Sequence, residues 1–251
     1  MKLFALLFFI FQISWIPVPA DKLPVEKNKD NTENESSQNN YVTDLYEKCE
    51  LAGKLDFNIF CMAIAGYSNI TTQNSKVISI VDLTKPSNQK RLFIIDLEKE
   101  KLLYRTFVAH GKNSGEVIPT KFSNKIGSLK SSLGFYLTGS TYIGKHGYSL
   151  LLNGLEKGIN DNARVRGIVI HAAKYVSKKY IERNNRLGRS WGCPAVSEEL
   201  SRQIIDTIKN GSCLFIYADD VNYQKKSVFA NLPQLNLHQL AYNNFHSNLS
   251  N

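Results

Sequence analysis

The sequence predicts a mainly β (α+β) fold, a mostly antiparallel or mixed β-sandwich with a short helical element before it and a helix near its end. From residue 76 the chain consists largely of short runs rich in Val, Ile, Leu, Phe and Tyr, a composition typical of strands. Few helices separate these runs, and strand and helix do not alternate regularly, which argues against a parallel α/β sheet. Roughly 180 residues lie between two polar ends, enough for one sizeable core.

The first forty residues predict an exported protein with a disordered tether. Residues 1–20 carry one lysine, then an apolar run, and end on the small-residue pattern V-P-A, which is typical of a secretory signal peptide cleaved near Ala20. The apolar run is shorter than the ~20 residues that a bilayer requires, so no stable membrane insertion is expected. Residues 21–40 contain almost no apolar side chains and predict a disordered tether. We therefore expect the mature protein in the periplasm or cell envelope.

Residues 41–75 predict a helical element packed on the core. Apolar residues recur there at helical spacing in two series, the second beginning at Phe57. Gly53 separates the two series, so we expect two short helices, the second ending at Gly66. Helices of this length are marginal alone, which favours their packing on the strands.

The strands of the core are expected within residues 76–222. The runs KVISIV, RLFIID and KLLYRTFVAHG predict three strands, and LEKEK predicts the hairpin turn between the last two. The run SCLFIYA predicts the final strand. Gly, Ser and Asn residues separate three further short strands, expected around 133–137, 148–152 and 167–171.

Two helices are expected late in the core. Residues 174–184 predict a helix with only a narrow apolar stripe. Ser197 is expected to cap a clearer helix, which stops at Asn210-Gly211. Residues 223–251 are rich in Asn and Gln and predict a polar C-terminal tail, either a short docked helix or no regular structure.

Positive charge is concentrated in one stretch of a chain whose formal net charge is +9. Eight Lys and Arg residues and a single Glu lie between Arg164 and Arg189. One interpretation is a solvated helix face, which suits Lys178 and Lys179. The other is that this stretch attracts a polyanionic or carboxylate-bearing substrate. Nucleic acid is not an expected partner, because no nucleic-acid-binding motif occurs.

The four cysteines fall into different contexts. Cys49 and Cys61 lie in helical stretches, where a disulfide between them is an alternative to ordinary helix packing, and Cys213 lies in an apolar strand. No C-x-x-C spacing occurs, so neither a zinc site nor a thioredoxin-type site is indicated. Cys193 stands between a glycine and a proline in RLGRSWGCPAV. Such a thiol on a sharp turn is expected to be exposed, as a nucleophile, a metal ligand or a disulfide partner.

His171 is the candidate base for this thiol. It ends the apolar run GIVIH, a buried strand that would hold its ring at a rigid edge. A nucleophilic thiol requires a nearby base and backbone N–H groups that stabilise the oxyanion. One helix and a glycine-containing turn separate His171 from Cys193, so the chain is able to fold back and bring imidazole to sulfur.

The order of these residues resembles the H-G…S-x-G-C signature of the YkuD-type L,D-transpeptidases. The wider pattern is closer still to their exported branch, the murein L,D-transpeptidase catalytic domain (YkuD_2). The likeness covers residues 41–220, and cysteine peptidases of the NlpC/P60 type have the opposite order, with cysteine before histidine. The matching segments are VAHGKNSG, the run from FSNKIGSLK to GIVIHAA, YVSKKYI and RLGRSWGCPAV.

The resemblance implies a role for each residue of the signature. Cys193 would be the nucleophile and His171 its base. Ser190 would order the turn, and the backbone N–H groups of Gly192 and Cys193 would form the oxyanion hole. Glycine at this position allows a backbone to approach a tetrahedral intermediate.

Arginines near the cysteine would raise its thiolate character, and Arg186 and Arg189 are the candidates. In the broader family an arginine often stands two residues after the cysteine, where this chain has Ala195. Arg189, Arg186 or Arg166 would then take over its role of holding a carboxylate.

Three other positions bear on the resemblance. The residue after the base is usually glycine in the family and is Ala172 here. Trp191 occupies a position that is often histidine, where it would wall the site or stack on a sugar or peptide plane. His146, in GKHGYSL, would either approach the site or serve as an ordinary turn residue.

The reaction that the resemblance implies is acyl transfer on peptidoglycan stem peptides. The thiolate would attack the amide between diaminopimelate and D-Ala, releasing D-Ala and forming an acyl-enzyme, and an amine would then accept the acyl group. No metal or organic cofactor is implied. The acyl acceptor and the oligomeric state are not indicated by the sequence.

Three alternatives stay open at this point. Water as the acceptor would make the protein an L,D-carboxypeptidase. Ala172 and the absent arginine leave room for a catalytically silent cell-wall-binding protein that keeps the fold. A disulfide from Cys193 to Cys213 or Cys61 would make the cysteine purely structural.

Overall fold

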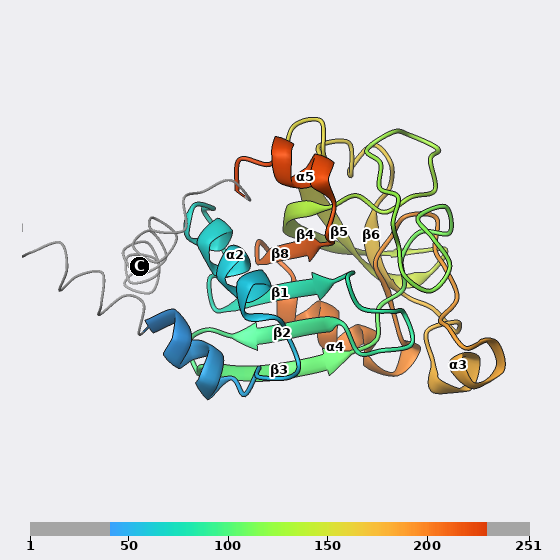
Figure 1. Ribbon diagram of the computed structural model, residues 1–251. Coiled ribbons are helices and arrows are strands. Elements are labelled where there is room, and N and C mark those ends of the chain that lie inside the picture. Colours follow the sequence, from blue (N-terminus) through green and yellow to red (C-terminus); the bar gives the residue numbers. More distant parts are fainter. Residues whose placement is uncertain (1–40, 230–251) are drawn as a thin grey trace, which may run out of the picture.

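The protein, as seen in a computed structural model that describes residues 41–229, is built on one mixed eight-stranded sheet with helices packed on it (Figure 1). The strand order is β3-β2-β1-β8-β4-β5-β6-β7. This confirms the mainly β class with attached helices. The expected signal peptide (1–20), the tether (21–40) and the tail beyond residue 229 lie outside the described residues. Within residues 41–229, no helix has the length and apolar character needed to cross a membrane.

The first half of the sheet forms the core of the molecule. Strands β2 and β3 pair antiparallel, as the hairpin signal LEKEK predicts, while β1 pairs antiparallel with β2 and parallel with β8. Every residue of β1, β2 and β8 is buried. Both faces are covered, because α2 contacts β1 and β8 while α4 contacts β1, β5 and β6, and Figure 1 shows α2 in front of β1. The bounds are β1 Val77–Asp82, β2 Leu92–Asp96, β3 Lys101–Thr106, β8 Cys213–Tyr217, α2 Phe57–Ser68 and α4 Glu198–Ile208.

The second half of the sheet carries the residues of the candidate site. Strands β4 (Gly134–Gly144) and β5 (Gly147–Gly154) form a long hairpin with residues 145 and 146 at its tip. Strand β6 (Val169–Ala172) pairs antiparallel with β5 and parallel with β7 (Ala195–Val196). The expected strands at 133–137 and 148–152 are therefore parts of longer ones.

Two helices form at the N-terminal end of the described chain, as predicted, at 41–48 and in α2. The Asp56 carboxylate caps α2 by accepting from the backbone N–H groups of Asn58 and Ile59. The helix runs on past Gly66, where it was expected to end. A Cβ at Gly66 would lie 2.0 Å from the Phe135 ring, so this glycine permits close contact between helix and sheet and does not terminate the helix.

The helix predicted over 174–184 is shorter than expected. It is α3 (Lys178–Asn184), with the Ser177 hydroxyl accepting from the Tyr180 N–H, and none of its residues is buried. Ala173 and Val176, which precede it, are buried in a small separate cluster and continue the chain from β6 outside any helix. Ser197 occupies the N-cap position of α4, as predicted, although its side chain makes no capping hydrogen bond.

A short helix, α5 (Val221–Lys226), spans the boundary expected between core and tail. The buried Glu156 carboxylate holds it in place, accepting from Ser227 Oγ at 2.5 Å and from the Tyr223 hydroxyl at 3.3 Å. The same carboxylate accepts from the Phe135 backbone N–H at 2.7 Å. Residues up to Phe229 therefore belong to the folded core.

All four cysteines are free. The expected alternative of a Cys49–Cys61 disulfide is not realised, and Cys193 is bonded to neither Cys213 nor Cys61. A purely structural role for Cys193 as a disulfide partner is therefore wrong for this structure.

Replacing Ser227 by alanine is expected to lower the free energy of unfolding by about 2 kcal/mol, because a hydrogen bond to a buried carboxylate is lost and one Glu156 oxygen stays unsatisfied. Urea denaturation followed by circular dichroism measures the change. Thr207→Ala removes an exposed hydroxyl that bonds only within its helix, and it should change stability by no more than about 0.5 kcal/mol. Equal effects of the two substitutions would show that Glu156 does not anchor α5.

Candidate active site

A cavity of about 530 Å³ opens where β6, the loop before β7 and the tip of the β4–β5 hairpin meet. It gathers most of the predicted site residues, although Gly192 is buried beside it and Arg186 does not line it. The residues on its walls are Tyr142, Lys145, His146, Arg166, Gly167, Val169, His171, Tyr175, Arg189, Ser190, Trp191 and Cys193.

The turn that carries Cys193 is held by the Ser190 hydroxyl. This hydroxyl donates to the Cys193 carbonyl at 2.6 Å and accepts from the Gly192 N–H at 3.1 Å. Gly192 adopts φ +124°, and a Cβ there would lie 2.8 Å from the Lys130 carbonyl oxygen, so only glycine fits without strain. Ser190 and Gly192 thus fix the direction of the thiol.

The oxyanion hole differs from the expectation at Gly192. Its N–H is already bound to the Ser190 hydroxyl and does not point freely into the cavity. The Cys193 backbone N–H has no hydrogen-bond acceptor within residues 41–229. Among the described residues it is therefore a donor that the protein leaves free.

His171 projects from β6, and the register of the sheet places it opposite Ala195, two residues beyond Cys193. Its Nδ1 lies 2.9 Å from the Ala172 carbonyl oxygen, so Nδ1 carries the proton and donates, and Nε2 keeps its lone pair. The His146 ring stacks on it at 4.2 Å between centroids and 20° between planes. The alanine that replaces the usual glycine contributes only this backbone contact to the base.

No hydrogen bond joins His171 and Cys193 among the described residues. The thiol donates instead to the Gly167 carbonyl, with 3.6 Å between Sγ and oxygen. Catalytic hydrogen bonds are often long in proteins without substrate, so this geometry is that of a resting thiol. Both groups line the same cavity.

Comparison with known proteins places this arrangement in a family. A family model described as the L,D-transpeptidase catalytic domain matches residues 51–217, which include the cavity, the thiol and the imidazole. The chain belongs to the L,D-transpeptidase catalytic domain family.

Solved structures similar to this family member are distant. An L,D-transpeptidase from Mycobacterium smegmatis is 13% identical with a TM-score of 0.34, over 57% of this chain and 59% of that one. An L,D-transpeptidase (Yku) from Stackebrandtia nassauensis is 13% identical with a TM-score of 0.35, over 77% of this chain and 93% of that one. The aligned part therefore spans less than two thirds of the mycobacterial protein. Comparison with curated proteins found no match.

Burial and charge act in opposite directions on the thiol of this L,D-transpeptidase domain. Burial raises the pKa of Cys193, while a hydrogen bond from the Val169 backbone and the positive charges of Arg166 and Lys145 lower it in part. Burial likewise lowers the pKa of His171, and the neighbouring His146 and Lys145 lower it further. Thiol and imidazole are thus both neutral near pH 7, a pair suited to proton transfer during attack.

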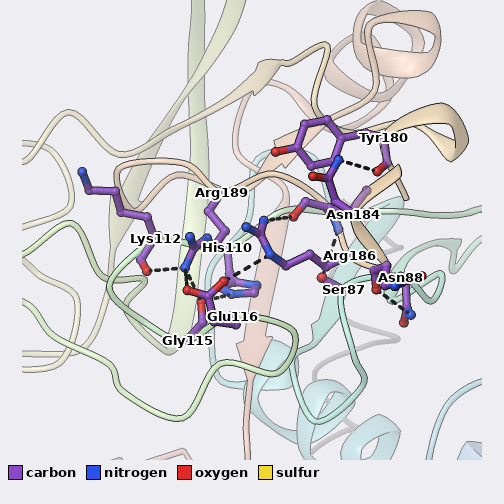
Figure 2. Close-up of polar contacts among 12 residues, drawn as sticks. Ser87, Asn88, His110, Lys112, Gly115, Glu116, Tyr180, Asn184, Arg186 and Arg189 are labelled. Carbon is purple, nitrogen blue, oxygen red and sulfur yellow. Dashed lines mark hydrogen bonds and ion pairs between the residues drawn. The ribbon is translucent and has the colours of Figure 1, made fainter. Parts of the chain in front are cut away.

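Arg186 and Arg189, the expected sources of positive charge, are held by Glu116 (Figure 2). Arg186 Nε lies 3.1 Å from Glu116 Oε2, and an Arg189 terminal nitrogen lies 2.5 Å from Glu116 Oε1. Arg189 also donates to the carbonyls of Lys112 and Gly115. One carboxylate thus faces two guanidinium groups, and the positive charges that lower the pKa of Cys193 are those of Arg166 and Lys145 instead.

Arg166 is also committed to structure. Its guanidinium donates to the carbonyls of Ser123 and Lys130 and to the hydroxyls of Ser128 and Ser132. These contacts join Arg166 to the loop at 123–132. The side chain keeps its charge near the thiol but has few donors left for a substrate carboxylate.

Lys145 is the functional candidate that sequence reasoning missed. Its Nζ lies 4.9 Å from the centre of the Trp191 ring, and no ion pair engages it in the part of the chain that the structure describes. Trp191 is 65% exposed at the mouth of the cavity. The available signal was the turn GKHG at a hairpin tip, which places Lys145 beside His146.

Within residues 41–229, no three His, Cys, Asp or Glu side chains gather in an arrangement that could hold a metal ion.

Replacing Lys145 by glutamine is expected to raise the pKa of both Cys193 and His171, because its charge lowers both. The pH at which iodoacetamide alkylation of Cys193 is half-maximal should move upward, and so should the titration of His171 followed by NMR. The shift should shrink at high salt, since Lys145 is exposed. Lys179→Gln, on the outer face of α3, is the matched control and should leave both curves in place. Unchanged curves in the Lys145 variant would remove this lysine from the site.

Proposed function

We propose that the protein is an exported cysteine L,D-transpeptidase that acts on peptidoglycan stem peptides. The observation that supports it most is the single cavity shared by a thiol on a rigid turn and a buried neutral imidazole with its Nε2 lone pair free. Family membership supplies the reaction class. The signal-peptide pattern of residues 1–20 supplies the expectation of export.

The acylation step follows from the roles of these groups. His171 Nε2 takes the Cys193 proton as sulfur attacks the carbonyl carbon of the amide between diaminopimelate and D-Ala. The Cys193 backbone N–H stabilises the oxyanion. When the C–N bond breaks, the proton on His171 passes to the leaving amine of D-Ala, and a thioester remains on Cys193.

The second step returns the thiol to its starting state. An incoming amine loses a proton to His171 and attacks the thioester carbonyl, and the departing sulfur takes that proton back. If water attacks instead, the product is the shortened stem peptide and the activity is that of an L,D-carboxypeptidase. The acceptor therefore decides between the two activities.

Substrate binding is assigned to the exposed groups at the mouth of the cavity. Trp191 offers an aromatic surface on which a sugar or peptide plane could stack, and Lys145 beside it offers a cation for a carboxylate. His146 covers the far face of the His171 ring. Arg189 and Arg186 could bind a carboxylate only by exchanging it for Glu116.

The absent arginine two residues after the cysteine does not favour a silent protein. Ala195 is fully buried in β7, where its carbonyl accepts from the Ala109 N–H at 2.8 Å. An arginine side chain would not fit there without rearrangement. The carboxylate-binding role, if required, therefore falls to other residues such as Lys145.

The proposal is tested first by intact mass after incubation with a carbapenem. We expect one covalent adduct on the native protein and none on Cys193→Ala, because the thiol attacks the strained lactam carbonyl as it would attack the stem peptide. Cys61→Ala is the matched control and should retain the adduct. If the native protein is folded and reduced but forms no adduct, the assignment of Cys193 as the nucleophile is contradicted.

A stem tetrapeptide ending in D-Ala then separates the activities. Release of D-Ala with a cross-linked product when an acceptor stem is present would support transpeptidation. Release with only the tripeptide, at every acceptor concentration, would support the carboxypeptidase instead.

A further inference from the structure

Residues 109–112 hold the catalytic turn, residues 190–194, through backbone hydrogen bonds. The Ala109 N–H donates to the Ala195 carbonyl at 2.8 Å, and the Ser190 N–H donates to the His110 carbonyl at 2.9 Å. The Lys112 N–H donates to the Ser190 carbonyl at 2.8 Å. These three backbone bonds bracket Cys193, two on the side of Ser190 and one beyond Pro194.

The side chain of His110 holds this segment in place. It is 1% exposed, with Nδ1 2.8 Å from a terminal nitrogen of Arg91 and Nε2 3.1 Å from the Gly115 carbonyl oxygen. Arginine only donates, so Nδ1 accepts and Nε2 carries the proton that goes to Gly115. Figure 2 shows His110 beside Gly115, Glu116 and Arg189.

Arg91 is itself entirely buried and braces His110. Its remaining donors are satisfied by the carbonyls of Val108, at 3.1 and 3.0 Å, and Lys85, at 2.8 Å. No carboxylate lies within ion-pair distance of it among residues 41–229, although Asp82 is near enough to stabilise its charge. Burial lowers its pKa to about 9, so it stays cationic at neutral pH.

The imidazole between these groups is held in one protonation state. Burial and the charge of Arg91 lower the pKa of His110 to about 4, with smaller contributions from Arg189 and Arg186. A buried cation beside a buried imidazole costs more than an apolar pair of the same size. This free-energy cost is explained if the rigid polar contacts fix a neighbouring element. That element is the turn that carries Cys193.

We propose that His110, braced by Arg91, is a positioning residue for Cys193, an inference that rests on the proposed function. The His110 side chain is held by its hydrogen bonds with Arg91 and with the Gly115 carbonyl. Because the His110 carbonyl accepts from the Ser190 N–H, the position of His110 determines where the Ser190 backbone lies. Ser190 in turn places the Cys193 carbonyl and the Gly192 N–H through its hydroxyl. His110 itself does not line the cavity and reaches it only through its carbonyl contact with Ser190.

Two further contacts tie the same segment to the turn. The Gly111 N–H donates to Ser131 Oγ at 3.0 Å, and that hydroxyl lies 3.4 Å from the Gly192 carbonyl oxygen. The Gly115 carbonyl that binds His110 also accepts from Arg189 at 3.3 Å. A displacement of His110 would therefore be transmitted to the turn through three contacts, at Ser190, at Gly192 and at Arg189.

The test compares His110→Ala and His110→Asn with the native protein. The asparagine amide oxygen can stand in for Nδ1 toward Arg91, but the side chain is too short to reach Gly115. We expect the alanine variant to lose at least ten-fold in kcat for D-Ala release from a stem tetrapeptide and in the rate of Cys193 alkylation by iodoacetamide, with KM within two-fold. The asparagine variant should recover part of both losses.

Ser227→Ala is the matched control, because it destabilises the fold by removing a hydrogen bond to Glu156, and neither residue lines the cavity. It should lower the unfolding midpoint while leaving kcat and alkylation unchanged below that midpoint. If His110→Ala does not fold, His110→Asn and Arg91→Lys take its place, and each should show a partial loss of kcat and of the alkylation rate. Folded His110 variants that keep the native kcat and alkylation rate overturn the inference.

The two proposals fail in different ways. Native protein that releases no D-Ala, while its alkylation still depends on His110, would refute the transpeptidase and leave the positioning role standing. Native D-Ala release that is indifferent to His110 would do the reverse. A native Cys193 that resists iodoacetamide would overturn both.

Discussion

The pairing of β7 with the elements on its two sides is the contact on which the candidate site depends. Strand β7 contains only two residues, and a strand of that length has too few ladder bonds to be stable alone. It is held by parallel pairing with β6 on one side and by a bridge from Ala109 to Ala195 on the other. The first contact brings the residue that bears the base to the level of the thiol, and the second fixes the turn that bears the thiol. Nucleophile and base are thus set by backbone hydrogen bonds and not by contact with each other.

Charge around the thiol is arranged so that its cations are mostly occupied. Glu116 holds Arg186 and Arg189, and backbone carbonyls and serine hydroxyls hold Arg166. Burial then dominates the pKa of Cys193, which is raised, whereas a thiolate formed in advance would need uncompensated positive charge nearby. A raised thiol pKa accords with the proposed transfer of the Cys193 proton to His171 during attack. Lys145 is left as the cation most exposed to a substrate.

The parts of this arrangement that are local in sequence could be predicted from the sequence. The run GIVIH predicts a buried strand ending in histidine, and G-C-P predicts a thiol on a sharp turn, because glycine, proline and apolar runs act on the backbone within a few residues. The same holds for the β2–β3 hairpin and for α4. Gly66 shows the limit, because the space it provides is set by Phe135, a residue of a distant strand. The sequence pattern around Gly66 predicted instead that the helix ends there.

The parts that depend on distant residues could not be predicted. The stacking of His146 on His171 requires the long β4–β5 hairpin to fold over β6, and Glu116 meets its arginines only because two loops about seventy residues apart in sequence lie together. The hydrogen bond from the Gly192 N–H to the Ser190 hydroxyl could not be predicted for a similar reason, since the direction of that hydroxyl decides it. His110 gave no signal of its own in the sequence.

Competitive alkylation of the four cysteines in the folded protein tests the central claim most directly. Burial raises the pKa of Cys49 and Cys61 to about 11 each and keeps Cys213 inaccessible, whereas Cys193 lines an open cavity. With limiting iodoacetamide at pH 7.5, followed by peptide mass spectrometry, we expect Cys193 to be labelled first and its labelling to fall sharply in His171→Ala. Labelling of Cys61 before Cys193, or labelling of Cys193 that does not depend on His171, would contradict an activated nucleophile at this turn.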